Sequence, residues 1–274
     1  MAIRPAATIL LLRDAAVGVE VFMVRRNPSS AFVGGAYVFP GGRVDVLDAI
    51  DPGRCSGLDA RTADQRLGVA GQGLAFHVAA VRECFEEAGV LLAYDRQGNL
   101  LDFSAPEADA HYRSLRDRLN AGTLSFGALL EQEDLTLALD RLAYLSHWIT
   151  PMGEPRRFDT RFFAAEAPAN QVAAHDDWEL TDSDWVRPDE ATERARKREW
   201  QIILPTMANL RAIADHPSAA EAVSWARRQR LPLPAILPKV YQGRLVLPGD
   251  EDYDLGEPDI SLLDREGRDR AFLP

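Results

Sequence analysis

Three glutamates near the middle of the chain are the side chains whose type and spacing most clearly indicate chemistry. They are Glu83, Glu86 and Glu87, in the stretch VAAVRECFEEAGV at 78–90. At about 100° per residue, Glu86 and Glu87 lie within roughly 60° of Glu83 on one side of a helix, whereas Val81 and Phe85 lie on the opposite side. The spacing therefore predicts a helix with an apolar core face and an acidic face.

Two interpretations of the acidic face remain open from the helix alone. Most glutamate-rich helix faces are simply solvated. The alternative is a site for Mg²⁺ or Mn²⁺, because these ions prefer carboxylate and water oxygens in octahedral geometry. Glu83 repels Glu86 and Glu87 by about 0.2–0.5 kcal/mol each, and Arg82 is the only nearby cation on the helix. This repulsion favours the metal site.

Apolar periodicity and turn residues predict the elements that must position this helix. The helix itself is expected over 75–89, with Gly89 as its C-cap. A hairpin is expected from strands at 6–12 and 19–25, and a short strand at 36–40 is expected to end in a turn at Gly41 and Gly42. Further strands are expected at 142–150, 156–166 and 243–249, helices at 105–121, 125–132 and over most of 189–229, and a strand running into a helix at 176–191.

The residues VFPGGRVDVLD (38–48) and the acidic helix together resemble the Nudix box. In that family a glycine is followed six residues later by a glutamate, and then by the pattern Arg-Glu-x-x-Glu-Glu-x-Gly. Gly42 matches the box glycine, with Gly41 beside it, and Arg82 and Gly89 match the first and last positions of the second half. Asp48 stands where the box has its first glutamate and keeps the charge on a shorter side chain.

An interruption separates the two halves of the box. Gly42 and Arg82 lie 40 positions apart where the box has 14, which leaves 26 extra residues between Asp48 and Leu74. The free energy of loop closure grows only logarithmically with loop length, so this excursion need not keep the two halves apart. Residues 49–73 show no clear period, and we expect a loop or short-helix excursion. It either covers the substrate or is a neutral surface insertion.

The resemblance implies a fold and a reaction. The expected fold is α/β, a Nudix α/β/α sandwich with a mixed sheet, and the expected reaction is divalent-metal-dependent hydrolysis of a diphosphate linkage. In the family, the glutamates that match Glu83, Glu86 and Glu87 hold the metal ions, and the arginine that matches Arg82 orients one of them. Glu179 matches a further metal ligand or general base of some members, and the identity of the base stays open.

The expected organisation is a Nudix hydrolase domain over 1–191 with two insertions. One insertion is 49–73 inside the box, and the other is helical and lies near 104–135. Residues 192–274 are expected to form a C-terminal helical extension and a tail that pack on the same domain.

The flanking sequence narrows the branch of the family. Residues 21–45 and 147–166 resemble coenzyme A and acyl-CoA diphosphatases that carry an interrupted box, which implies cleavage of CoA or acyl-CoA to 3′,5′-ADP and (acyl-)4′-phosphopantetheine. Arginine binds phosphate through paired N–H groups, and aromatic side chains can stack on a base. The candidate substrate-binding residues are Arg25, Arg26, Phe32, Arg156, Arg157 and Phe158. Their alternatives are surface arginines on strands and aromatic side chains of the core.

Other functions stay open beside this one. Within the family, the alternative is a pyrophosphatase that acts on NADH, ADP-ribose or another nucleoside diphosphate derivative. Outside catalysis, some Nudix-fold proteins are ligand sensors or interaction modules, and their usual mark is loss of the box glutamates. All three glutamates of the second half are present, which favours the enzyme.

Composition limits the partners and the compartment. The net charge of −11 argues against a broad nucleic-acid surface, so the expected partner is a small molecule. No apolar run approaches the ~20 residues that span a bilayer. The two cysteines are too few for a disulfide framework, and the five histidines have no ligand spacing. We therefore expect a cytoplasmic protein without membrane association, and the family analogy admits a homodimer.

Overall fold

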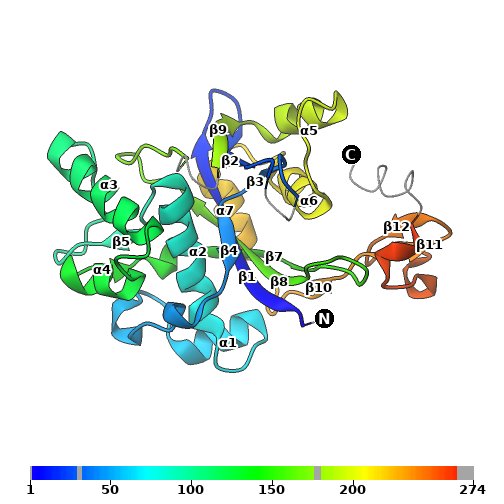
Figure 1. Cartoon of the computed structure of the whole chain (residues 1–274), viewed down its shortest axis with the longest axis horizontal. Coiled ribbons are helices and arrows are strands. Elements are labelled where there is room, and N and C mark those ends of the chain that lie inside the picture. Colours follow the sequence, from blue (N-terminus) through cyan, green and yellow to red (C-terminus); the bar gives the residue numbers. More distant parts are fainter. Residues whose placement is uncertain (1, 30–32, 176–179, 264–274) are drawn as a thin grey trace.

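The structure is a computed structural model that describes residues 2–29, 33–175 and 180–263. Within these ranges an eight-stranded mixed sheet has the strand order β10-β7-β8-β1-β2-β3, with β4 beside β1 and β9 beside β2 (Figure 1). Its strands are β1 (Arg4–Asp14), β2 (Val19–Arg26), β3 (Tyr37–Val38), β4 (Gly41–Arg43), β7 (Ala143–Ile149), β8 (Phe158–Glu166), β9 (Leu180–Val186) and β10 (Ala235–Ile236). Two small hairpin sheets pair β5 (Ala93–Tyr94) with β6 (Thr136–Leu137) and β11 (Lys239–Tyr241) with β12 (Arg244–Val246).

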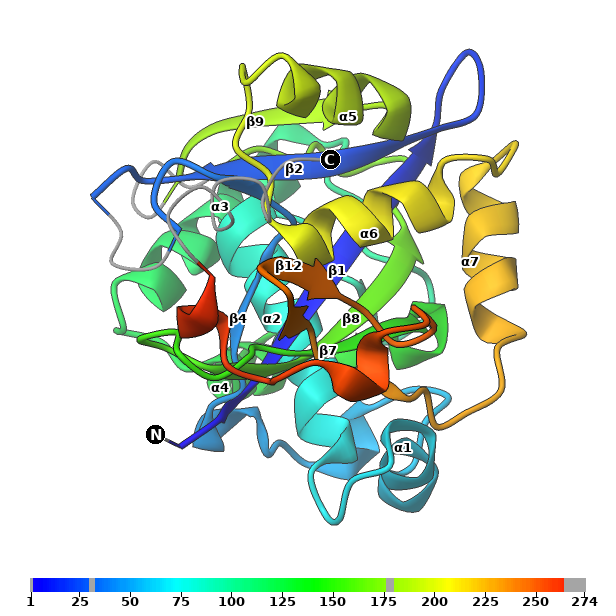
Figure 2. The same cartoon turned by 90° about the vertical axis from the view of Figure 1, so that its right-hand side faces the viewer.

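Helices cover both faces of the large sheet. They are α1 (Ala60–Leu67), α2 (Gly73–Ala88), α3 (Pro106–Asn120), α4 (Phe126–Gln132), α5 (Pro188–Arg196), α6 (Leu204–Ile213) and α7 (Ala219–Arg227). Buried side chains of α1 to α4 belong to one hydrophobic core, and those of α5 to α7 belong to a second core on the opposite face (Figure 2). The expected α/β/α sandwich with a mixed sheet is confirmed.

Strand β1 carries the sequence pattern that builds both cores. Ile9 and Leu11 lie in the first core, and Leu10 and Leu12 lie in the second, because successive side chains of a strand point to opposite faces. β1 pairs antiparallel with β2, as the predicted hairpin requires, and parallel with β8. The strand is therefore the central support of the sheet.

Helix α2 has the boundaries and the apolar face that its sequence predicts. It begins two residues before the expected start and ends at Ala88, and the next residue, Gly89, has the left-handed φ of 71° expected for a C-cap. Val78, Val81 and Phe85 are buried in the first core. The side of the helix that carries the glutamates therefore faces away from this core.

The insertion at 49–73 packs into the protein interior. It contains α1, and its side chains Leu58, Ala63 and Leu67 are buried in the first core. A β-carbon at Gly73 would lie 2.4 Å from the backbone carbon of Ala63, so glycine permits the close approach of α1 to the start of α2. The segment therefore supplies part of the core and is not confined to the surface.

The C-terminal part of the chain ends in a small separate unit, here called the C-terminal module (238–263). It contains β11, β12 and two short 3₁₀ helices, and has its own apolar cluster of Val240, Ile260 and Leu263. Backbone hydrogen bonds of 2.8 Å join Met152, in the loop between β7 and β8, to Pro258 and Ile260. The module therefore sits beyond the tips of β7 and β8 (Figures 1 and 2). No helix in the described ranges is long and apolar enough to cross a membrane.

Candidate active site

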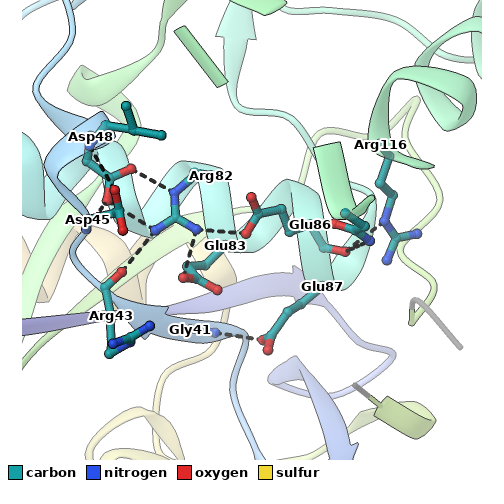
Figure 3. Close-up of polar contacts among 11 residues, drawn as sticks. Gly41, Arg43, Asp45, Asp48, Arg82, Glu83, Glu86, Glu87 and Arg116 are labelled. Carbon is teal, nitrogen blue, oxygen red and sulfur yellow. Dashed lines mark hydrogen bonds and ion pairs between the residues drawn. The ribbon is translucent and has the colours of Figure 1, made fainter. Parts of the chain in front are cut away.

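Strand β4 and helix α2 bring the two halves of the box together. Gly41 and Gly42 pair in register with Thr8 and Ala7 of β1, so they form a strand and the predicted Gly-Gly turn is wrong. The backbone N–H of Gly41 donates a hydrogen bond of 2.8 Å to Oε2 of Glu87 (Figure 3). Residues 46 positions apart in the chain therefore meet at one place, despite the interruption.

Glycine is required at position 42 because a carboxylate fills the adjacent space. A β-carbon on Gly42 would lie 2.4 Å from Oε1 of Glu83. This distance is below any normal non-bonded contact, so a larger residue would push the glutamate away from the strand. The backbone of β4 thus forms one side of the space that the Glu83 carboxylate occupies.

Arg82 connects the residues of the box. Its Nε donates to Oδ1 of Asp48 at 2.7 Å, and its Nη1 donates to Oε1 of Glu83 at 2.8 Å and to Oε2 of Glu86 at 2.7 Å. Its Nη2 donates to the carbonyl oxygen of Arg43 at 2.9 Å. The guanidinium therefore fixes two carboxylates of α2 relative to β4 and to the first half of the box (Figure 3).

Asp48 has a positioning role, which the sequence left undecided. Its side chain is fully buried, accepts two hydrogen bonds from Arg82, and accepts another from the backbone N–H of Asp45 at 2.7 Å. The last bond belongs to a capping box at the short 3₁₀ helix Val46–Asp48. Asp48 thus holds Arg82, and Arg82 holds Glu83 and Glu86.

Helix α3 secures the end of α2 that carries the glutamates. The Nε of Arg116 donates to the backbone carbonyl oxygen of Glu86 at 2.9 Å, and the amide of Asn120 donates to the same oxygen at 3.3 Å. Carbonyl groups in the last turn of a helix lack partners within the helix. The predicted helical insertion therefore supplies these partners and fixes the position of the acidic face.

The electrostatics of the cluster differ from those of a solvated helix face. Burial raises the pKa of Glu83 from 4.5 to about 7; the Arg82 guanidinium opposes this shift and Glu86 adds to it. Burial disfavours the charged form of Arg82, but the bond to Asp48 and the charges of Glu83 and Glu86 raise its pKa. Glu87 is only 5% exposed. The interpretation of a simple solvated acidic face is therefore wrong.

The donor types at the site fit a hard divalent cation. Three carboxylates line one cavity, beside a strand whose glycine leaves room for them, and carboxylate oxygens are the ligands that Mg²⁺ and Mn²⁺ prefer. Within the described ranges, no group of three or more histidine, cysteine, aspartate or glutamate side chains is assembled as a metal site. Arg82 instead forms ion pairs with Glu83 and Glu86. The site therefore contains carboxylate ligands for a cation, but they are not arranged as a complete coordination site.

A cavity of about 1160 Å³ opens from this cluster. It is lined by Glu83, Glu86 and Glu87, by residues of α3 and α4, and by residues of β1, β7 and β8. Such a volume lies slightly above the range of about 300–1,000 Å³ that is common for small-molecule sites. In the part of the chain that the structure describes, no residue of 49–73 lines the cavity, so the cavity lends no support to a substrate-covering role for this insertion.

The predicted substrate-binding residues divide into three groups. Arg26, Arg156 and Phe158 line the cavity. Arg25 and Arg157 do not line it. The Nε of Arg25 donates to the Gly35 carbonyl oxygen, and that of Arg157 donates to the Thr150 carbonyl oxygen. Phe32, a candidate stacking residue, and Glu179, a candidate ligand or base, lie outside the described residues.

The sequence reasoning missed several residues of the cavity. Arg4 and Arg43 line it, and so do Trp148, the start of α6 and three side chains of the C-terminal module, Pro238, Leu245 and Ile260. Arg43 follows Gly42 directly and could have been found from the box. No sequence pattern indicated that the C-terminal module lies at the cavity, because its position depends on backbone hydrogen bonds to a loop some 100 residues earlier in the chain.

The mixed sheet, the helix with its three glutamates and the adjoining glycine strand together define a Nudix hydrolase site. The comparisons agree: the model of the NUDT19 Nudix domain matches residues 54–213, and the chain belongs to the Nudix hydrolase family. The matched range contains the acidic helix and begins after the glycine half of the box.

Relatives and solved structures give the same family. A human protein named acyl-coenzyme A diphosphatase NUDT19 is 31% identical over 87% of this chain and 73% of its own length. A Caenorhabditis elegans protein named putative nudix hydrolase 7 is 28% identical over 76% of this chain and 59% of its own length. A Nudix hydrolase from Alicyclobacillus acidocaldarius, known from a crystal structure, is 30% identical, and the match covers 82% of this chain and 96% of that chain with a TM-score of 0.65.

Proposed function

We propose that this protein hydrolyses the diphosphate linkage of CoA or acyl-CoA to 3′,5′-ADP and (acyl-)4′-phosphopantetheine, with Mg²⁺ or Mn²⁺ as cofactor. The observation that carries the proposal is a single cavity that combines three glutamates, several arginines and an apolar end. The printed name of the human relative, acyl-coenzyme A diphosphatase, supports the same substrate class.

Glu83, Glu86 and Glu87 would hold the metal. When bound, the divalent ion supplies charge neutralisation for the diphosphate and a lowered pKa for a water ligand. The protein's own part is to place these carboxylates: Arg82 orients Glu83 and Glu86, and the Gly41 N–H orients Glu87. One of these glutamates or Glu179 accepts the proton of the attacking water.

Arginines along the cavity would bind the remaining phosphate oxygens. Arg26 and Arg156 line the cavity, and Arg4 and Arg43 line it as well. The chain has a net charge of −11, so an anionic substrate needs such local cations to be held. Guanidinium groups suit this role because they bind phosphate through paired N–H groups.

A substrate panel tests the proposal. The enzyme is incubated with CoA, octanoyl-CoA, ADP-ribose, NADH and a dinucleoside polyphosphate, each with Mg²⁺ and with Mn²⁺, and the products are separated and weighed by mass spectrometry. We expect 3′,5′-ADP from the two CoA substrates at the highest kcat/KM. Faster cleavage of ADP-ribose or NADH would contradict the proposed substrate class, and binding without turnover of any substrate would identify a non-catalytic sensor.

A further inference from the structure

The floor of the cavity crosses four strands in register. Arg43 of β4 pairs with Ala6 of β1, Ala6 pairs with Thr160 of β8, and Thr160 pairs with Trp148 of β7. All four residues line the cavity. Neighbouring strands lie about 4.8 Å apart, so the row from Arg43 to Trp148 extends roughly 14 Å.

The two ends of this row differ in chemistry. At the Arg43 end, the Arg43 carbonyl oxygen accepts from Arg82, and Glu83 lies against Gly42. At the Trp148 end, a group of apolar side chains from three separate parts of the chain lines the cavity, beside the polar side chains Thr150, Glu154 and Arg156 of the β7–β8 loop. The members of the apolar group are Trp148, Phe162, Leu204, Pro238, Leu245 and Ile260.

The C-terminal module closes the apolar end. Leu245 is on β12, and Ile260 is in the last 3₁₀ helix of the module. The Met152 N–H donates to the Pro258 carbonyl oxygen and the Ile260 N–H donates to the Met152 carbonyl oxygen, and these bonds hold the module against the loop that follows β7. In Figure 2, β12 lies in front of β7 and β8. The module is therefore fixed close to the floor strand that carries Trp148.

We propose that this apolar end binds the acyl-pantetheine arm of the substrate, and that Leu245 of the C-terminal module limits which acyl chains fit. This inference rests on the function proposed above. The pantetheine arm consists of three units joined by two amides, and it spans on the order of 10–15 Å when extended. With the diphosphate at the glutamates, the sulfur of such an arm arrives near Trp148, where an acyl chain meets apolar side chains.

The lining of the glutamate end matches this orientation. Adenosine 3′,5′-bisphosphate is anionic and requires cations, and Arg43 lines the cavity directly after Gly42, which lies against the Glu83 carboxylate. An acyl chain requires contacts that exclude water, which the module and the start of α6 supply. Each methylene that becomes buried improves binding by up to about fourfold, so chain length should strongly affect KM.

Substitution of Leu245 tests the inference. Leu245→Trp fills the apolar end and should raise the KM for octanoyl-CoA about tenfold or more, while the KM for free CoA changes far less. Leu245→Ala enlarges the same end, so the acyl chain length that gives the highest kcat/KM should increase. Leu255→Trp is the matched control, because Leu255 belongs to the same module, is 63% exposed and does not line the cavity. The melting temperature of each variant verifies folding.

A binding measurement separates failure of this inference from failure of the proposed function. Octanoyl-pantetheine contains no diphosphate and cannot be hydrolysed, so calorimetry with this probe reports only the arm site. If octanoyl-pantetheine binds Leu245→Trp more weakly than it binds wild type and Leu255→Trp, the arm site is supported. This conclusion holds even if the protein does not cleave CoA. If both Leu245 variants instead cleave CoA with the wild-type ratio of kcat/KM for octanoyl-CoA to kcat/KM for CoA, that result would overturn the arm site and leave the proposed function standing.

Discussion

At the scale of single residues, the site depends on one guanidinium shared among several oxygen acceptors. Arg82 is mostly buried, and its hydrogen bonds reach Asp48, Glu83, Glu86 and the backbone of β4. Arginine suits this place because its planar group presents several N–H donors in fixed directions. A lysine would supply one point charge and could not join both halves of the box with the same geometry.

Conversion of a single carboxylate to an amide should separate catalysis from folding. We expect Glu87→Gln to lower kcat/KM by about 100-fold or more, because the amide loses the charge that a divalent ion requires. An oxygen remains to accept the Gly41 N–H, so the melting temperature should stay close to that of wild type. The control is Glu107→Gln on the exposed side of α3. Turnover near the wild-type value at saturating Mg²⁺ would show that Glu87 holds no metal.

Asp48 should contribute to stability as well as to activity. In Asp48→Asn, the buried side chain keeps its size but no longer balances Arg82, and removal of one partner from a buried pair is costly. We expect a loss of about 2–3 kcal/mol in the free energy of unfolding, measured in urea, together with a lower kcat. Asp45→Asn is the control, since Asp45 is exposed and bonds only within its own turn. Equal stability of the two variants would show that Asp48 does not support Arg82.

At the scale of elements, the sequence predicted what local periodicity determines. The limits of α2, the β1–β2 hairpin and the strands at β7 and β8 all follow from patterns within a few turns or a few residues. Strand β4 was missed because two glycines favour a turn, whereas its pairing with β1 depends on residues more than 30 positions away. In the same way, alternation along β2 directs Arg26 to the cavity and Arg25 away from it, and a count of arginines cannot reveal this choice.

A buried histidine on α2 should make the stability of the protein depend on pH. Burial lowers the pKa of His77 from 6.5 to about 4, while its Nδ1 lies 2.7 Å from the Gly73 carbonyl oxygen. The unfolded chain therefore binds a proton between pH 6.5 and 4 that the folded chain does not bind. This difference reduces the free energy of unfolding as the pH falls through that range.

Urea unfolding of wild type and His77→Asn at pH 7 and at pH 5 measures this contribution. Asparagine retains a donor for Gly73 and cannot be protonated. We expect wild type to lose about 2 kcal/mol more than the variant between the two pH values. The comparison uses the change with pH, so a constant destabilisation from the smaller side chain does not affect it. Parallel pH dependences would contradict the assignment of a neutral buried imidazole.

At the scale of the whole molecule, the candidate site is assembled from distant parts of the chain. The box glycines, the acidic helix, the ends of three strands, the α3–α4 insertion and the C-terminal module all contribute to one cavity. Sequence reasoning predicted the glutamate end of this candidate site because the second half of the box has a fixed local spacing. It could not identify the apolar end, since Trp148, Leu204 and Leu245 have ordinary core-like surroundings in the sequence and meet only through the sheet register and the module.

Because the carboxylates belong to this assembly, binding of a cation should stabilise the entire fold. A ligand that binds only the folded state adds RT ln(1 + [L]/Kd), which is about 2.7 kcal/mol at 100 times Kd. For a chain of this size, that energy corresponds to an increase of roughly 5–10 °C in melting temperature.

We therefore expect Mg²⁺ or Mn²⁺ at millimolar concentration to raise the melting temperature of wild type, measured by calorimetry at constant ionic strength. The combined variant Glu83→Gln, Glu86→Gln, Glu87→Gln should lose this increase, while the exposed-surface variant Glu107→Gln should keep it. An equal increase in wild type and in the triple variant would place the cation elsewhere on the protein, and no increase in wild type would contradict metal binding by these three glutamates.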